Sequence, residues 1–140
     1  MKRVLFLCTG NSCRSQMAEG LINADFAGKI EAFSAGTEPH GLNPTAVQVM
    51  AELGIDISRQ TSDHISRFDG RNFDYVITLC GDANEKCPLF FGGVKRLHMG
   101  FDDPPKAQGT PEEVLDVYRR VRDEIREQLG GFFQRELSGR

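Results

Sequence analysis

The sequence has no apolar run long enough to cross a membrane, since such a helix needs roughly 20 consecutive apolar residues and the runs here are far shorter. It also has no signal-peptide pattern, because residues 1–3 lead into only a few apolar residues before Cys8. No repeat, linker or low-complexity segment is present. We therefore expect a single domain over residues 1–140, located in the cytoplasm.

An excess of one charge is lacking too. The chain carries 17 Lys and Arg against 20 Asp and Glu, for a formal net charge of -3. This balance provides neither the basic stripe that nucleic acid requires nor a polybasic membrane anchor, so we expect no partner of either kind. Four cysteines in a cytoplasmic protein are more often reactive or metal-bound than joined in structural disulfides.

Apolar residues recur alternately with the spacing of buried strands and of helices. We predict strands over residues 4–7, 31–36, 74–80 and 93–101, and helices over residues 15–26, 43–54 and 110–129. Gly130 and Gly131 are expected to end or fray the last helix, leaving a mobile tail. Strands alternating with helices predict an α/β fold: a four-stranded parallel sheet in the order 2-1-3-4, flanked by helices.

Two of the cysteines stand where predicted strands end. Cys8 follows the first strand and Cys80 ends the third. Ligands of open α/β sheets bind beyond the carboxyl ends of the strands. If the first and third strands are neighbours, both thiols lie at the same edge of the sheet.

The loop after Cys8 has the composition of an anion site. Its short residues and Gly10 allow successive N–H groups to point inward, and the following helix adds a positive end. Arg14 offers a planar fork for two oxygens, and Ser15 can donate a hydrogen bond to a Cys8 thiolate. We predict oxyanion binding by Thr9, Gly10, Asn11, Ser12, Cys13, Arg14 and Ser15. The lysine of a nucleotide P-loop is missing, which argues against ATP or GTP.

Simpler interpretations exist for several of these residues. Cys8 could be a small buried residue that ends a strand, and Cys13 could line the loop without a chemical role. From the residues alone, Asp103 is best explained as part of a solvated turn. The scattered histidines have no paired ligand spacing. A zinc site of four cysteines is disfavoured because the spacing in at least one of the pairs Cys8/Cys13 and Cys80/Cys87 is too long, and because Arg14 would repel the metal.

Three segments together resemble the low-molecular-weight protein tyrosine phosphatase fold and, within it, the thioredoxin-coupled arsenate reductases. They are CTGNSCRSQMAEG at residues 8–20, VITLCGDANEKCP at 76–88 and HMGFDDPPKAQGT at 98–110. The resemblance implies that Cys8 is the nucleophile, Arg14 the oxyanion clamp and Asp103 the general acid. It implies arsenate as substrate in arsenic detoxification, phosphate or sulfate as competing oxyanions, thioredoxin as reductant, and a monomer.

The other two cysteines distinguish a reductase from a phosphatase. A reductase must transfer two electrons, which thiols do by serial exchange, and the resemblance implies a relay from Cys8 to Cys80 to Cys87. We expect no organic cofactor, because the Met and Phe residues are more simply explained as core. A potassium ion is expected from a ligand pattern in some members of the reductase family, matched here by Asn11, Glu19, Ser34, Thr61 and Asp63. All five carry oxygen donors, as a hard cation needs, although a plain hydrogen-bond network would use the same residues.

Two alternatives to a reductase remain. The first is a low-molecular-weight phosphatase, which needs only the thiol, the arginine and the acid. Phosphotyrosine phosphatases of this fold usually carry aromatic residues after the acid, whereas Asp103 is followed by PPKAQGT. A small inorganic oxyanion therefore fits better, with phosphatase activity as a side reaction. The second alternative is a non-catalytic module that binds oxyanions or senses redox state.

Overall fold

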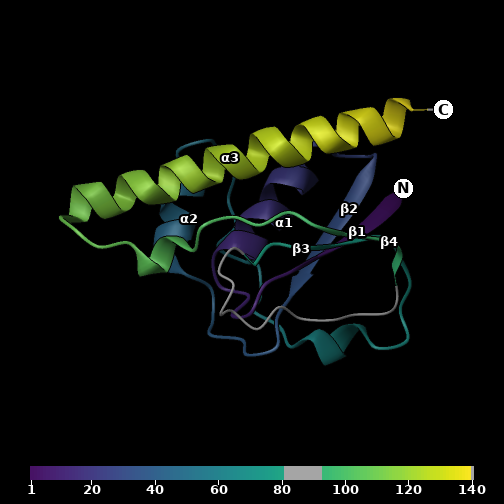
Figure 1. Ribbon diagram of the computed structural model, residues 1–140, viewed down its shortest axis with the longest axis horizontal. Helices are drawn as coiled ribbons and strands as arrows, with labels where there is room; N and C mark the ends of the chain where they lie inside the picture. Colours follow the sequence, from purple (N-terminus) through teal and green to yellow (C-terminus); the bar gives the residue numbers. More distant parts are fainter. Residues whose placement is uncertain (81–92, 140) are drawn as a thin grey trace.

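A parallel sheet forms the centre of the molecule (Figure 1). The computed structural model describes residues 1–80 and 93–139. The strands are β1 (Lys2–Leu7), β2 (Ile30–Ala35), β3 (Phe73–Thr78) and β4 (Gly93–His98), in the order β2-β1-β3-β4. The predicted topology is confirmed. Because Leu7 lies opposite both Ala35 and Thr78, Cys8 and Cys80 follow neighbouring strands at one edge of the sheet.

Three α-helices and two short 3-10 helices accompany the strands in the described part of the chain. They are α1 (Arg14–Asp25), α2 (Pro44–Ala51), η1 (Ile65–Phe68), η2 (Pro104–Lys106) and α3 (Pro111–Ser138). The sequence signals at two helix starts act as expected: Asn43 caps α2 ahead of Pro44, and Thr110 forms a capping box with Glu113 ahead of Pro111. Over residues 1–80 and 93–139, no helix has both the length and the apolar character needed to cross a membrane.

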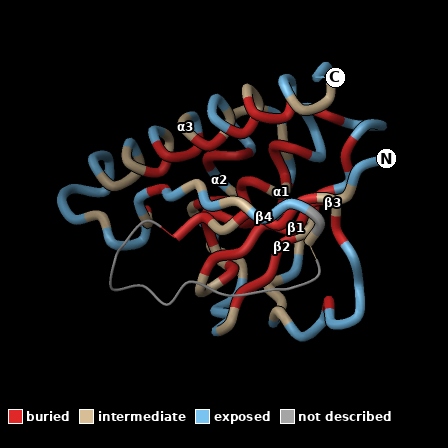
Figure 2. The backbone as a smooth tube through the Cα atoms, turned by 45° about the vertical axis from the view of Figure 1, so that its right-hand side comes forward, coloured by how far each residue is buried: buried red, intermediate tan, exposed pale blue. Residues whose placement is uncertain are grey.

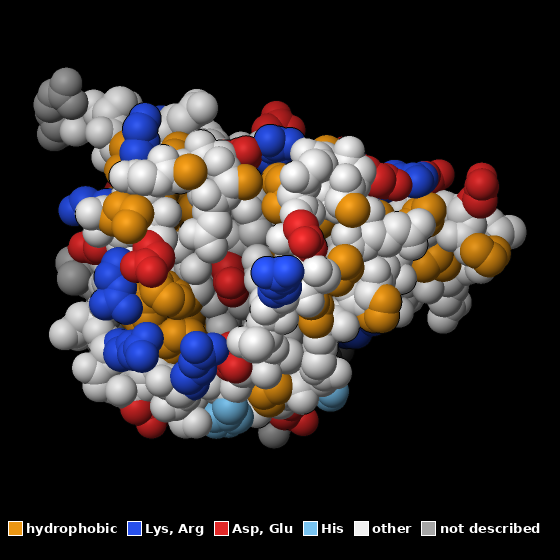
Figure 3. Space-filling model, turned by 180° about the vertical axis from the view of Figure 1, so that it is seen from behind, with side chains coloured by type: hydrophobic (Ala, Val, Ile, Leu, Met, Phe, Trp, Pro, Cys, Tyr) orange, Lys and Arg blue, Asp and Glu red, His pale blue; other side chains and the backbone are white. Residues whose placement is uncertain are grey.

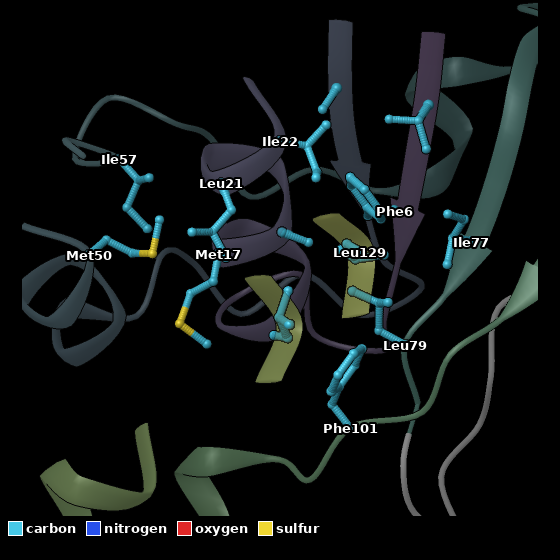
Figure 4. Close-up of a cluster of buried hydrophobic side chains, with 14 of the residues drawn as sticks. Phe6, Met17, Leu21, Ile22, Met50, Ile57, Ile77, Leu79, Phe101 and Leu129 are labelled. Atoms are coloured by element: carbon cyan, nitrogen blue, oxygen red, sulfur yellow. The ribbon is translucent and has the colours of Figure 1, made fainter. Parts of the chain in front are cut away.

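The alternation of side chains along β1 divides the core between the two faces of the sheet. Val4 and Phe6 lie in the larger cluster, together with buried residues of α1, α2 and α3. Figure 4 shows this cluster, in which Phe6, Met17 and Leu129 come from β1, α1 and α3. Packing α1 against this face places its N-terminus directly after the β1 strand end.

The second face of the sheet has a smaller core. Leu5 and Leu7 pack there with Phe68 and Phe73, and Phe33 makes edge-to-face contacts with both of those rings at 5.8 and 5.7 Å. Arginine guanidinium groups cover the rings: Arg3 lies 5.2 Å from the centroid of Phe73 and Arg67 lies 5.5 Å from that of Phe68. Figure 3 shows basic side chains gathered around a hydrophobic patch on the back of the molecule.

The prediction that Gly130 and Gly131 end or fray the last helix is wrong. Helix α3 continues through both glycines to Ser138, with buried residues along its inner side and exposed residues along its outer side (Figure 2). Phe132 and Phe133 are buried, with ring centroids 5.8 and 5.3 Å from that of Tyr75. Two interior glycines cost about 2 kcal/mol relative to alanine, whereas burying two phenylalanines stabilises by about 3–6 kcal/mol. Tertiary packing therefore outweighs the local preference.

Candidate active site

The loop from β1 to α1 holds its carbonyl groups outward. They accept hydrogen bonds from outside the loop: Thr9 O from Glu38 N (2.9 Å), Gly10 O from His40 N (2.9 Å), Asn11 O from Gln16 Nε2 (3.0 Å) and Ser12 O from Asn43 N (3.0 Å). In a trans peptide unit the N–H points opposite to the C=O. The N–H groups of the loop therefore face its interior, which is the geometry of an anion nest.

Local sequence makes this tight curl possible. Asn11 has φ of 44°, in the left-handed region that asparagine tolerates better than most residues. Gly36, at the end of β2, lies so close to the loop that a Cβ atom there would be 2.5 Å from Thr9 O. Cys13 is the N-cap of α1 and makes no capping side-chain hydrogen bond. The first N–H groups of α1 thus lack a side-chain cap, and the helix N-terminus faces the same interior.

Cys8 is buried under this loop and is held by a chain of directed hydrogen bonds. Asn11 Oδ1 accepts from the backbone N of Asp63 (2.7 Å), which fixes the orientation of the amide. Asn11 Nδ2 then donates to Ser15 Oγ (2.8 Å). Because that oxygen accepts from Asn11, its own proton is free to point at Cys8 Sγ, 2.9 Å away. The predicted contact between Ser15 and the sulfur is present.

Arg14 closes the other side of the loop. Its side chain is 3% exposed, and Nη1 donates to the carbonyl oxygens of Leu79 (3.3 Å) and Phe101 (3.1 Å), beyond β3 and β4. Its Nε lies 3.6 Å from Asp103 Oδ1. Asp103 has an extended backbone, as expected for a residue before proline, and lines the cavity over the loop. It therefore belongs to the site rather than to an isolated solvated turn.

The cavity in front of Cys8 has a volume of about 460 Å³. Cys8, Thr9, Gly10, Ser12, Cys13 and Arg14 line it from the loop, and Asp103 lines it from the opposite side. Sequence reasoning missed seven further lining residues, of which three, His40, Asn43 and Lys106, have polar side chains. The helix-start signal had identified Asn43 only as a cap; His40 carries no sequence signal, because its place depends on how residues 38–43 pair with the loop.

The remaining cysteines differ in what surrounds them. Cys80 is buried just beyond β3 and is a free thiol. Cys13 is buried in the cavity wall, where desolvation raises the pKa of its thiol well above the ordinary range, with smaller contributions from Asp103 and Cys8. Cys87 lies outside the described residues.

The four residues that share the potassium-type pattern with Asn11 form a second polar cluster, on the side of Asn11 away from Cys8. Glu19, Ser34, Thr61 and Asp63 line a cavity of about 490 Å³, and Asn11 contacts Asp63 as above. Ser34 Oγ donates to Glu19 Oε1 (2.6 Å), and Thr61 Oγ1 donates to Asp63 Oδ2 (2.8 Å).

Burial and the nearby Asp63 raise the pKa of Glu19 to about 7, against the opposing effects of Ser34 and Arg67. Arg67, which sequence reasoning did not include, forms an ion pair with Asp63. Oxygen donors fit a hard cation, but a guanidinium already supplies positive charge at this cluster. Among the described residues no group of three or more His, Cys, Asp and Glu could hold a metal ion.

Comparison with known proteins gives consistent matches over nearly the whole chain. Residues 3–138 match the family model of low molecular weight phosphotyrosine protein phosphatase. The arsenate reductase of Shouchella clausii is 60% identical over 124 residues, covering 89% of each chain. A solved arsenate reductase in the phosphate binding state superimposes with a TM-score of 0.82 at 39% identity, covering 96% of this chain and 98% of the other.

A third match is more distant. The thioredoxin-dependent arsenate reductase Cg_ArsC1' of Corynebacterium glutamicum superimposes with a TM-score of 0.67 at 26% identity, covering 99% of this chain and 64% of the other. The family match and the high identity over most of both chains leave one assignment: the chain belongs to the low molecular weight phosphotyrosine protein phosphatase family and, within it, to the arsenate reductases.

Proposed function

We propose that the protein reduces arsenate to arsenite on Cys8 and passes the resulting oxidation through Cys80 to Cys87 and thioredoxin. The observation that carries the proposal is the Cys8 thiol at the floor of an N–H-lined cradle, with Arg14 and Asp103 on the cavity side. Asn11 and Ser15 hold the sulfur in place from behind. This arrangement suits nucleophilic attack on a tetrahedral oxyanion.

In the first step the Cys8 thiolate attacks arsenic. Arg14 and the loop N–H groups stabilise the negative oxygens, and Asp103 protonates the departing oxygen, which leaves as water. The product is a sulfur–arsenic adduct in which arsenic is still pentavalent. Asp103 faces the cavity within 3.6 Å of Arg14 Nε, on the side from which a leaving oxygen would depart.

In the second step Cys80 attacks the sulfur of Cys8. The electron pair of the sulfur–arsenic bond passes to arsenic, which becomes trivalent and leaves as arsenite, while a Cys8–Cys80 disulfide forms. Support comes from the parallel pairing of β1 and β3, which puts both cysteines at one sheet edge. Cys87 then attacks Cys80 and frees Cys8. Thioredoxin reduces the Cys80–Cys87 disulfide, as the name of the Corynebacterium relative suggests.

A phosphatase is the second candidate, because the cavity is larger than one oxyanion and the family model is that of phosphotyrosine phosphatases. None of the described residues that line the cavity is Phe, Tyr or Trp. A phosphotyrosine ring would therefore find no aromatic side chain to stack on, which favours an inorganic oxyanion.

The deciding experiment compares two activities of the same preparation: arsenate turnover with thioredoxin, thioredoxin reductase and NADPH, and hydrolysis of an aryl phosphate. We expect arsenate turnover to dominate. Peptide mapping should find Cys80–Cys87 in wild type oxidised by arsenate without thioredoxin, and Cys8–Cys80 in Cys87→Ser. Full thioredoxin-dependent turnover by Cys87→Ser would refute the relay and favour a small-thiol route.

A further inference from the structure

The proposed reaction assigns no role to the Cys13 thiol, a nucleophilic group that lines the cavity. Cys13 lies at the far end of the same loop as Cys8, both side chains are buried, and both line the cavity in front of the loop. Cys80 is buried as well but is not among the described residues that line this cavity. Among the described residues, Cys8 and Cys13 are therefore the two thiols that a molecule in the cavity meets.

The product of the reaction differs from the substrate in the chemistry that binds it. Arsenate is an anion that the N–H groups and Arg14 hold by charge. Arsenite is a neutral molecule near pH 7, so the cradle offers it little electrostatic attraction. Trivalent arsenic instead forms stable bonds to sulfur and takes two thiols where two are within reach.

We propose that Cys8 and Cys13 together form a dithiol site for trivalent arsenic, either arsenite or a monosubstituted arsenoxide. Two arsenic–oxygen bonds break and two arsenic–sulfur bonds form. From arsenite or the hydrated arsenoxide, two hydroxyl groups leave as two molecules of water. The Cys13 thiol supplies one proton, and the Cys8 thiol, or solvent where Cys8 is a thiolate, supplies the other. Arsenic stays trivalent, so the step needs no oxidant or reductant.

The environment of Cys13 suits this exchange. Its burial, together with the negative charges of Asp103 and Cys8, keeps the pKa of the thiol high, so Cys13 retains its proton in the free protein. It therefore adds no second negative charge to repel arsenate. It can still surrender the proton to a departing hydroxyl group of arsenite. Cys8 is a thiol again only after Cys87 has freed it, so the dithiol site forms at that point and binds arsenite released in the preceding step. The proposal rests on the proposed function only for its source of arsenite.

The test uses phenylarsine oxide, because one such arsenic atom takes two thiols. The chain has four cysteines, so the Cys80→Ser/Cys87→Ser variant retains only Cys8 and Cys13. We expect one bound phenylarsine oxide per chain by native mass spectrometry, release by a dimercaptan, and no free thiol when the complex is denatured and titrated. One thiol remaining free would overturn the proposal without any substitution at Cys13.

A matched variant measures the chelation. Adding Cys13→Ala to the double variant should weaken phenylarsine oxide binding by at least about 100-fold, because closure of the second bond is intramolecular. The circular dichroism spectrum should be unchanged and serves as the control for folding. An unchanged arsenoxide affinity would refute the dithiol site. Neither measurement needs turnover, so failure of arsenate reduction would be a separate result.

Discussion

Two polar clusters lie on opposite sides of Asn11 and are built from opposite chemistry. On one side, the loop over Cys8 turns N–H groups and Arg14 toward a cavity. On the other side, Glu19 and Asp63 turn side-chain oxygens toward a second cavity. The first arrangement suits an anion and the second a cation. The loop after Cys8 thus contacts both clusters, because its backbone N–H groups face the first cavity while the Asn11 side-chain oxygen faces Asp63.

Asn11 joins the two clusters, since one end of its amide contacts Asp63 and the other contacts Ser15. An asparagine can do this because it carries a donor and an acceptor on one rigid plane. The comparison predicts that changes at Cys8 and Arg14 abolish or cripple chemistry, that Asn11 transmits smaller effects, and that changes at Glu19 and Arg67 act mainly on stability.

The largest effect is expected for Cys8→Ser. A serine hydroxyl is a far weaker nucleophile than a thiolate, so arsenate reduction and any phosphatase activity should fall by at least about 1000-fold. Phosphate affinity, measured by calorimetry, should stay within a few-fold because the cradle is intact. Wild-type turnover in this variant would show that Cys8 is not the nucleophile.

Arg14→Lys should lower kcat/KM for arsenate by about 100-fold. A lysine ammonium keeps the charge but cannot hold two oxygens in one plane while also donating to the carbonyls of Leu79 and Phe101. Phosphate affinity should fall as well, in contrast to Cys8→Ser. Steady-state kinetics beside phosphate calorimetry separate the two variants, and equal behaviour would contradict the assignment of the clamp.

Asn11→Asp keeps the contact with one cluster and removes the contact with the other. The carboxylate can still accept from Asp63 N but cannot donate to Ser15, whose proton would turn toward it and away from Cys8. We expect kcat to fall by about tenfold, while the free energy of unfolding changes less than it does in Asn11→Ala. Asn11→Ala, the matched control, loses both contacts and should also lower the melting temperature. Unchanged kcat in Asn11→Asp would remove the proposed link.

Glu19 should give the protein a pH-dependent stability. Its pKa is about 7 in the folded state against an ordinary 4.5, so between these values the folded protein binds more protons than the unfolded chain. The free energy of unfolding should therefore fall as pH rises from about 4.5 to 7, by at most roughly 3 kcal/mol at about 1.4 kcal/mol per pKa unit. Urea unfolding of Glu19→Gln should lack this slope; an identical slope would exclude Glu19 as its source.

The smallest effect concerns the proposed potassium ion. Arg67 supplies positive charge at Asp63 and Thr61, so replacing tetramethylammonium by potassium should raise the melting temperature of wild type only slightly. In Arg67→Gln the cluster lacks that charge, and the potassium effect should grow, most clearly above pH 7 where Glu19 is ionised. Arg71→Gln is a matched control, because Arg71 also covers Phe68. Identical melting curves in both salts for Arg67→Gln would show that potassium does not bind at this cluster.

Much of the fold and of the cradle could be predicted because their signals are local. Strand and helix periodicity, the cap at Asn43 and the strand–loop–helix passage at Cys8 are each written in a few neighbouring residues. The end of α3 could not be predicted in this way. Gly130 and Gly131 are local stop signals, but Phe132 and Phe133 override them by packing against Tyr75, which lies more than 50 positions earlier.

The amino-acid sequence was enough to predict the chemistry at the strand end, where a thiol, an arginine and a serine share a loop of small residues. It was also enough to predict the parallel sheet that carries this loop. These depend on residue type and short-range spacing. The direction in which the loop N–H groups face depends on tertiary contacts, because residues 38–43 and Gln16 hold the loop carbonyl groups. The hydrogen bond between Asn11 and Asp63, and the position of the Arg67–Asp63 ion pair beside it, also depend on tertiary structure. Both require the loop after Cys8 to pack against the segment that holds Asp63 and Arg67.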